Sequence, residues 1–249
     1  DALYASQSDH VGKIKPKHPG SQKTIRRLNY ILRKSSLIFA GSDELADYAK
    51  QFNKTATHII PTSIQLPTKQ ISALNQDKKN IRIGWIGGNK NLNYLKLCDE
   101  ASAVIQNKYP HVEFSLMTGK PADFLETKWT FEPWSKVAEG DWLASLDIGI
   151  MPLHDDAWSR GKCAFKLLQY MSYGKPVVAS PVGANKSAVA AGKNGFLADS
   201  TAEWVAALET LIDDANRRRT MGEEGLAMFK KTFEQGVVHQ KIISIIKSS

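Results

Sequence analysis

The predicted fold is decided by one stretch of sequence, RGKCAFKLLQYMSYGKPVVAS, which occupies residues 160–180. Phe165, Leu168 and Met171 recur at helical spacing, so the first half predicts a helix with one apolar face. Gly174 is placed for a left-handed cap at the end of that helix. Pro176 and the β-branched residues after it begin an extended run to residue 180, so we expect the helix to be followed directly by a buried strand.

Three cations, Arg160, Lys162 and Lys166, precede or begin this predicted helix. A helix N-terminus carries free N–H groups and the positive end of the helix dipole, and cationic side chains beside it favour a polyanion such as a diphosphate. A solvated basic loop that leads into a core helix explains the same charges. Spacing alone leaves both interpretations open.

The same stretch resembles the signature of a known family. Residues 162–183, KCAFKLLQYMSYGKPVVASPVG, are similar to the sub-pattern G-K-C-x-F-K-L-L-x-Y-M of the GT-B glycosyltransferases of family 4, the group 1 transferases. Further agreement consists of a glycine-rich turn near Gly87, the segment DIGIMPL at 147–153 and NGFL at 194–197. The resemblance is strong from Ile81 to the end of the chain and weak before it.

From Ile81 onward, apolar strands alternate with amphipathic segments, which predicts a Rossmann-like, doubly wound parallel α/β sheet. The expected strands are 81–86, 112–117, 147–151, 176–180 and 195–198, with helical segments between them at 94–107, 142–146, 165–173 and 186–190. Three helices are expected after them, at 201–213, 217–230 and 235–247. In the family, such terminal helices cross back to the N-terminal domain. Ligands of such sheets bind beyond the carboxyl ends of the strands.

The first third of the chain predicts a shorter α/β segment. Residues 1–20 are expected to be a loop, and Ile25, Leu28, Ile31 and Leu32 predict one apolar face of a basic helix from Gln22 to Lys34. That helix either packs on a core, which we favour, or touches an anionic membrane. A strand at 37–40, a helix at 43–52 capped by a serine and a strand at 58–61 follow.

This segment resembles the end of the N-terminal domain of a GT-B enzyme. The expected organisation is therefore a remnant of the acceptor domain at 1–64, a linker at 65–80 and the C-terminal donor domain at 81–249. The sequence starts in mid-pattern without methionine, so we expect most of the N-terminal domain to be missing.

Composition limits the classes of function. The chain has 249 residues, and 33 Lys and Arg against 25 Asp and Glu give a net charge of +8, which favours polyanionic partners. Cys98 and Cys163 have no paired spacing, so we expect a reducing compartment: a cytoplasmic protein, peripheral to the membrane at most. Scattered histidines predict no metal site. The basic run at 217–219 lacks interleaved aromatic residues, which argues against nucleic acid.

The turn after the first long strand is the second candidate for a phosphate site. Gly87 and Gly88 permit close backbone approach, and Lys90 adds charge, although the glycines taken alone favour a tight structural turn. With the signature, the turn becomes a candidate for binding the donor diphosphate. Family members often carry arginine where this chain has Trp85, and Arg160, Lys162 or Lys166 are expected to compensate for that lost charge.

The family usually shows Glu-x7-Glu, in which the first carboxylate contacts the donor sugar and the second contacts the ribose. Gly161 and Gln169 occupy these two positions here. The resemblance therefore implies that Gln169 binds the ribose, by neutral hydrogen bonds that are weaker than those of a carboxylate. Asp155 and Asp156 are alternative acids for the sugar, unless they belong to a solvated loop or a helix cap.

Two further residues are candidates for contact with the nucleobase. Thr118 ends the second long strand, and Trp134 precedes the next helix. In a GT-B donor site, backbone groups near Thr118 face the base, and Trp134 is placed to stack on it. A core tryptophan is the alternative, and on residue type alone it is the more frequent one.

The resemblance implies the donor-binding half of a retaining, metal-independent glycosyltransferase without a cofactor. Such an enzyme moves a sugar from a nucleotide-diphosphate sugar to a glycan or lipid-linked acceptor, as in polysaccharide biosynthesis. In the family, the N-terminal domain supplies the catalytic contacts, so no catalytic residue is assigned, and we expect this chain to bind donor without transferring sugar. The rival hypotheses are a non-catalytic nucleotide-sugar binding module and a basic adaptor for membranes or nucleic acid.

Overall fold

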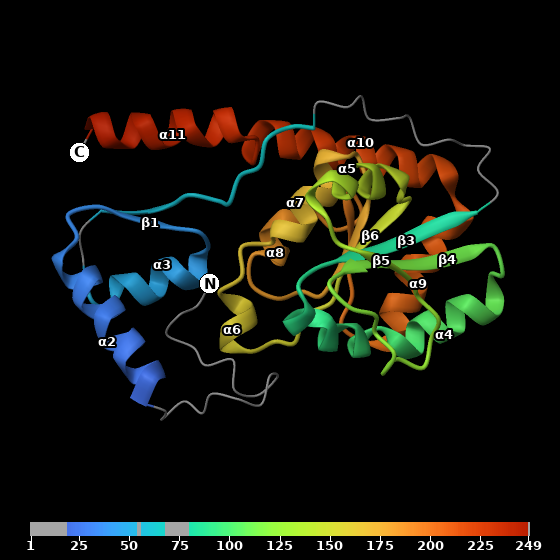
Figure 1. The fold of residues 1–249 in the computed structure, drawn as a ribbon. Coiled ribbons are helices and arrows are strands. Elements are labelled where there is room, and N and C mark those ends of the chain that lie inside the picture. Colours follow the sequence, from blue (N-terminus) through green and yellow to red (C-terminus); the bar gives the residue numbers. More distant parts are fainter. Residues whose placement is uncertain (1–18, 54–55, 68–79, 249) are drawn as a thin grey trace.

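The computed structural model describes residues 19–53, 56–67 and 80–248 (Figure 1). Residues 1–18 of the expected N-terminal loop and most of the expected linker lie outside this range. Pro19 and Gly20 already belong to α2 (Pro19–Lys34). A small parallel sheet of β1 (Ile38–Ala40) and β2 (Thr57–Ile59) follows, with α3 (Asp43–Lys50) between its strands and Ser42 as the N-cap.

The main sheet has six parallel strands in the order β5-β4-β3-β6-β7-β8. Their bounds are β3 (Ile81–Ile86), β4 (Val112–Thr118), β5 (Thr130–Pro133), β6 (Ile148–Met151), β7 (Val177–Ala179) and β8 (Gly195–Leu197). Because the chain order runs outward in both directions from β3 and β6, the doubly wound parallel α/β fold is confirmed. The edge strand β5 was not predicted, since its four residues are short of apolar side chains and partly exposed.

Helices cover both faces of this sheet (Figure 1). One face carries the 3₁₀ helix η1 (Asn89–Leu97), α4 (Asp99–Lys108) and α9 (Thr201–Asp213). The other carries α5 (Lys136–Ser145), α7 (Phe165–Ser172), α8 (Asn185–Ala188) and α10 (Ala215–Thr232). The single helix expected over 94–107 is therefore wrong in its first part, where the chain forms η1 and then restarts as α4.

The deciding stretch forms the predicted helix and strand, with one correction. Gly174 has a φ of 66°, so the left-handed cap after α7 is confirmed. Leu168 and Met171 are buried as expected, but Phe165 is 47% exposed and does not join the core face. Phe165 instead lies at the first position of α7 and lines a cavity described below.

The last helix, α11 (Gln235–Ser248), returns to the N-terminal segment, as the resemblance led us to expect (Figure 1). Its Lys241 Nζ donates to the carbonyl of Ile59 at 2.9 Å. Glu234, the residue directly before α11, forms a parallel β-bridge with Ile64. The C-terminal helix is thus tied to the end of the N-terminal segment.

Tyr170 on α7 holds the two central strands at the point where they separate. β3 and β6 are in register only at Ile83 with Ile148 and Gly84 with Gly149. Beyond that point the Tyr170 hydroxyl accepts from the N–H of Ile86 at 3.1 Å and donates to the carbonyl of Ile150 at 3.2 Å. Burial raises the pKa of this phenol, so it remains a donor. The helix is thereby fixed to both strand ends.

We expect Tyr170→Phe to lower the free energy of unfolding by about 1–3 kcal/mol, because it leaves the buried N–H of Ile86 without its partner. Urea denaturation measures this loss. Tyr30→Phe removes the same hydroxyl from a side chain that is 64% exposed and is the matched control. Equal stability of the two variants would show that the hydroxyl does not hold the strands.

Candidate functional site

A cavity of about 550 Å³ lies where the separated strands end. It opens at the carboxyl ends of β3 and β4, beside the N-terminus of α7, which is where an open parallel sheet binds its ligand. We call it the groove. Its lining residues are Ile86, Gly87, Gly88, Asn89, Asn91, Gly119, Trp134, Glu139, Phe165, Lys166 and Gln169.

Lys166 places a cation in the wall of the groove. Its Nζ lies 5.3 Å from the centroid of the Trp85 ring, so the residue at the family's arginine position supports the lysine. Burial, with a smaller contribution from the charge of Lys162, lowers the pKa of Lys166 to about 8. Within residues 19–53, 56–67 and 80–248, no carboxylate forms a salt bridge with it.

This lysine occupies the first turn of α7, where the helix dipole favours anions and opposes a cation. A partly buried cation at this place is costly in the free protein, and a bound anion would remove the cost. The arrangement therefore indicates an anion site.

The glycine turn opposite Lys166 is shaped for close approach. A Cβ at Gly87 would lie 2.6 Å from the Trp85 ring and 2.9 Å from Cε of Lys166, so no other residue fits there without displacing them. A Cβ at Gly88 would meet nothing within 4 Å, so that backbone faces open space. Lys90 is exposed and does not line the groove, whereas Asn91 does.

Trp134, Glu139 and Gln169 form one hydrogen-bonded group at the side of the groove. Trp134 is 53% exposed, which contradicts the core alternative, and its Nε1 donates to a Glu139 oxygen at 2.6 Å. Nε2 of Gln169 donates to the other oxygen at 3.0 Å. Glu139 was not predicted as a site residue from the sequence. The feature that could have indicated it is an acidic residue in the first turn of α5, five positions after Trp134.

Thr118 supports the groove without lining it. Its buried hydroxyl donates to Oδ1 of Asn89 at 3.0 Å, and Asn89 and the neighbouring Gly119 are the residues that reach the cavity. The side chain of Thr118 therefore orients Asn89, and the expected contact between backbone groups near Thr118 and a base stays a prediction.

The remaining candidates lie elsewhere, so the expected cation cluster is divided. Arg160 pairs with Asp155 at 2.6 Å. Both line a second cavity of about 390 Å³, together with Ser42, Asp43, Glu44, Gly183, Ala184, Lys186 and Ser187. This cavity lies between the N-terminal segment and the main domain. Arg160 and Asp155 thus face a different space from Lys166.

Three other candidate site residues lie at the ends of the short helix α6 (Ala157–Arg160) or directly after it. Asp156 is the N-cap, accepting from the N–H of Ser159 at 2.7 Å, so the cap alternative is confirmed. Gly161 is buried at the C-cap. Lys162 lies over the Tyr94 and Trp158 rings at 5.6 and 5.5 Å, and its Nζ donates to Asn91 at 3.5 Å, beside the groove.

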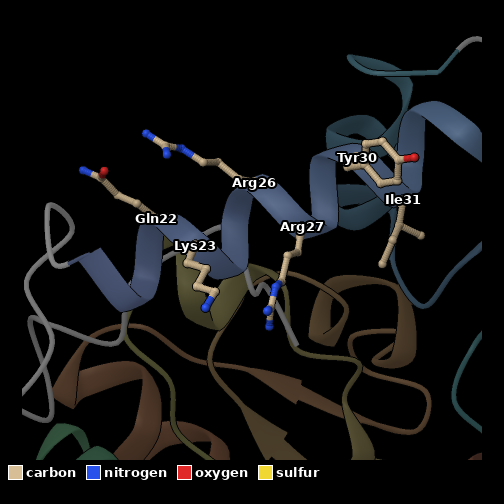
Figure 2. Close-up of a pocket in the computed structure, with 6 residues that line it drawn as sticks. All are labelled: Gln22, Lys23, Arg26, Arg27, Tyr30 and Ile31. Atoms are coloured by element: carbon tan, nitrogen blue, oxygen red, sulfur yellow. The ribbon is translucent and has the colours of Figure 1, made fainter.

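A third surface follows α2 (Figure 2). It is lined by Gln22, Lys23, Arg26, Arg27, Tyr30 and Ile31. Ile31 is 60% exposed, so its expected place on the buried face is wrong, whereas Leu32 is buried as expected. In the part of the chain that the structure describes, no helix is long and apolar enough to cross a membrane, and no cluster of His, Cys, Asp or Glu is suited to a metal.

Proteins of known structure share this fold. HepE of Anabaena, solved in complex with UDP, superimposes with a TM-score of 0.75 at 20% identity, over 95% of this chain and 70% of that one. Sucrose-phosphate synthase of Thermosynechococcus elongatus gives 0.70 at 16% identity, over 98% and 63%. At such identities the likeness shows the fold alone.

Sequence comparison adds the family. A D-inositol 3-phosphate glycosyltransferase of Paenarthrobacter aurescens (strain TC1) is 34% identical over 83 residues, which make up 32% of this chain and 19% of that protein. The chain therefore matches about a fifth of the length of this curated relative. The model of the family described as glycosyl transferases group 1 matches residues 80–214, more than half of the 249 residues. The chain belongs to the group 1 glycosyl transferases.

Proposed function

We propose that the groove binds the nucleoside diphosphate of a nucleotide-sugar donor, and that the chain serves in transfer of the sugar to a glycan or lipid-linked acceptor. The observation that carries the proposal is Lys166: a partly buried cation at a helix N-terminus, opposite a glycine turn and without a carboxylate partner among the described residues. Family membership and the UDP bound to HepE support the same class of ligand.

In the proposed reaction, a hydroxyl oxygen of the acceptor bonds to the anomeric carbon as the bond between that carbon and the diphosphate breaks. Negative charge accumulates on the leaving diphosphate, which takes up the proton of the acceptor hydroxyl. A fixed cation lowers the barrier to this step because its attraction grows as the charge develops. We assign that role to Lys166, and the resemblance supports transfer with retention of configuration and without a metal.

The test is calorimetric titration with UDP and GDP, with UMP as the control that lacks the second phosphate. We expect one diphosphate to bind at least about tenfold more tightly than UMP, since the second phosphate gains a charge-assisted hydrogen bond. Equal affinity for UDP, GDP and UMP would contradict the proposal. Release of labelled sugar from the bound donor to an acceptor would separate the transferase from a binding module.

The same titration has an expected pH dependence. The pKa of Lys166 in the free protein is about 8, so the cation is present at pH 7 and largely lost at pH 9. Because the anion binds the protonated form, affinity is expected to fall about tenfold between pH 7 and 9. An affinity that stays constant or rises over this range would show that Lys166 does not bind the diphosphate.

Contact with an anionic membrane remains a prediction. It rests on α2, where Lys23, Arg26 and Arg27 lie beside the exposed Tyr30 and Ile31 (Figure 2).

A further inference from the structure

Glu139 is a carboxylate in the wall of the groove whose protein partners are neutral. It accepts from Trp134 Nε1 at 2.6 Å and from Gln169 Nε2 at 3.0 Å. Across the described ranges, no lysine or arginine forms a salt bridge with it. A carboxylate offers about four lone-pair positions, so two of them are left for donors that enter the groove.

The contact with Glu139 also fixes what Gln169 can do. A carboxylate only accepts, so the amide NH₂ of Gln169 must face it. One amide hydrogen is thereby occupied, and Gln169 holds no negative charge. In the family pattern, position 169 holds the carboxylate that contacts the ribose. In this chain the negative charge lies instead on Glu139, to which Gln169 is hydrogen-bonded.

We propose that Glu139 supplies the carboxylate that binds the ribose hydroxyls of the donor, and that Gln169 is the positioning residue that orients it. Two vicinal hydroxyls are two donors, which matches the two remaining lone-pair positions of Glu139. Trp134, fixed by the same carboxylate, then lies at the side of the nucleoside. This inference rests on the proposed function, because it assigns a part of the same nucleotide to a residue in the same groove.

The alternative is that Glu139 only holds Trp134 and stabilises the first turn of α5. The two explanations differ in one readout. If Glu139 binds the ribose hydroxyls, it makes the protein bind UDP more tightly than 2′-deoxy-UDP, and GDP more tightly than 2′-deoxy-GDP. If Glu139 is purely structural, its replacement changes the affinity for both members of each pair equally.

The experiment exchanges the two side chains. Glu139→Gln, Gln169→Glu and the double variant Glu139→Gln/Gln169→Glu are titrated with both pairs of nucleotides. Glu224→Gln, the same change at an exposed site on α10, is the matched control. Urea denaturation establishes that each variant is folded.

We expect Glu139→Gln to bind the preferred diphosphate about tenfold or more weakly and to lose discrimination against the 2′-deoxy form, since hydrogen bonds to a charged group are lost. Gln169→Glu alone should also bind the diphosphate weakly, because it places a second carboxylate beside that of Glu139 and the two negative charges repel each other. The double variant restores one charge and one amide, so its affinity should return to within about threefold of the wild type.

Unchanged discrimination in Glu139→Gln, or a double variant no better than the single ones, would overturn the inference while leaving the donor site in place. Failure of the wild type to bind either diphosphate would overturn the proposed function and this inference together. The two failures are therefore distinguishable.

Discussion

Replacing Lys166 by methionine is expected to weaken binding of the nucleoside diphosphate by about 10- to 100-fold, because a charge-assisted hydrogen bond to phosphate is lost. The same change should stabilise the free protein at pH 7. Methionine keeps an unbranched chain against the Trp85 ring and removes a cation that burial disfavours.

The sign of the stability effect follows from the pKa values. The pKa of Lys166 is about 8 in the folded chain, below its ordinary value of 10.5. The unfolded chain therefore holds the proton more tightly, and the lysine destabilises the fold below pH 8. Its contribution to stability rises as the pH increases from about 8 to 10.5. Lys166→Met should lack this rise and gain on the order of 1 kcal/mol at pH 7.

Urea denaturation at pH 7 and pH 10, with calorimetry at pH 7, measures both effects. Lys193→Met changes an exposed lysine in the turn before β8 and should alter neither quantity. A Lys166→Met variant that is less stable and binds normally would mean that the lysine serves the fold and not the ligand.

Gly149→Ala is expected to destabilise the protein by about 3 kcal/mol through overpacking. A methyl group at this position of β6 would overlap the ring of Tyr170, which is itself held by both strands. The overlap can be relieved only by movement of α7. Because Lys166 and Gln169 lie on that helix, the affinity for the nucleotide should fall as well.

Gly225→Ala is the matched control for this prediction. Its Cβ would approach Met171 no closer than 3.4 Å, and alanine favours helix by up to about 1 kcal/mol, so this variant should be neutral or more stable. If Gly149→Ala unfolds at the same urea concentration as the wild type, the close contact between α7 and β6 is not what fixes the helix.

The regular part of the fold was predictable because its signals are local. Periodicity predicted all three terminal helices: α9 has the expected bounds, α11 is one residue longer, and α10 extends two residues beyond its expected bounds at each end. The cap at Gly174 needed only a residue that tolerates positive φ after an apolar helix. Burial of strands on both faces made β6 and β7 apolar throughout and β3 and β4 largely apolar, and all four were found.

The site was predictable only in part, because its geometry depends on contacts between distant residues. Ala164, with a φ of 53°, turns the chain between α6 and α7. Alanine rarely adopts this conformation, so nothing in the sequence marked the turn that separates Arg160 from Lys166. Likewise, the contact of Glu139 with Gln169 joins residues thirty positions apart.

A crystal structure of the protein with UDP would show where the nucleotide binds. We expect a diphosphate within hydrogen-bond distance of Lys166 Nζ, over the turn of Gly87 and Gly88, with the nucleoside beside Trp134. A nucleotide bound instead at Arg160, in the cavity between the N-terminal segment and the main domain, would contradict it.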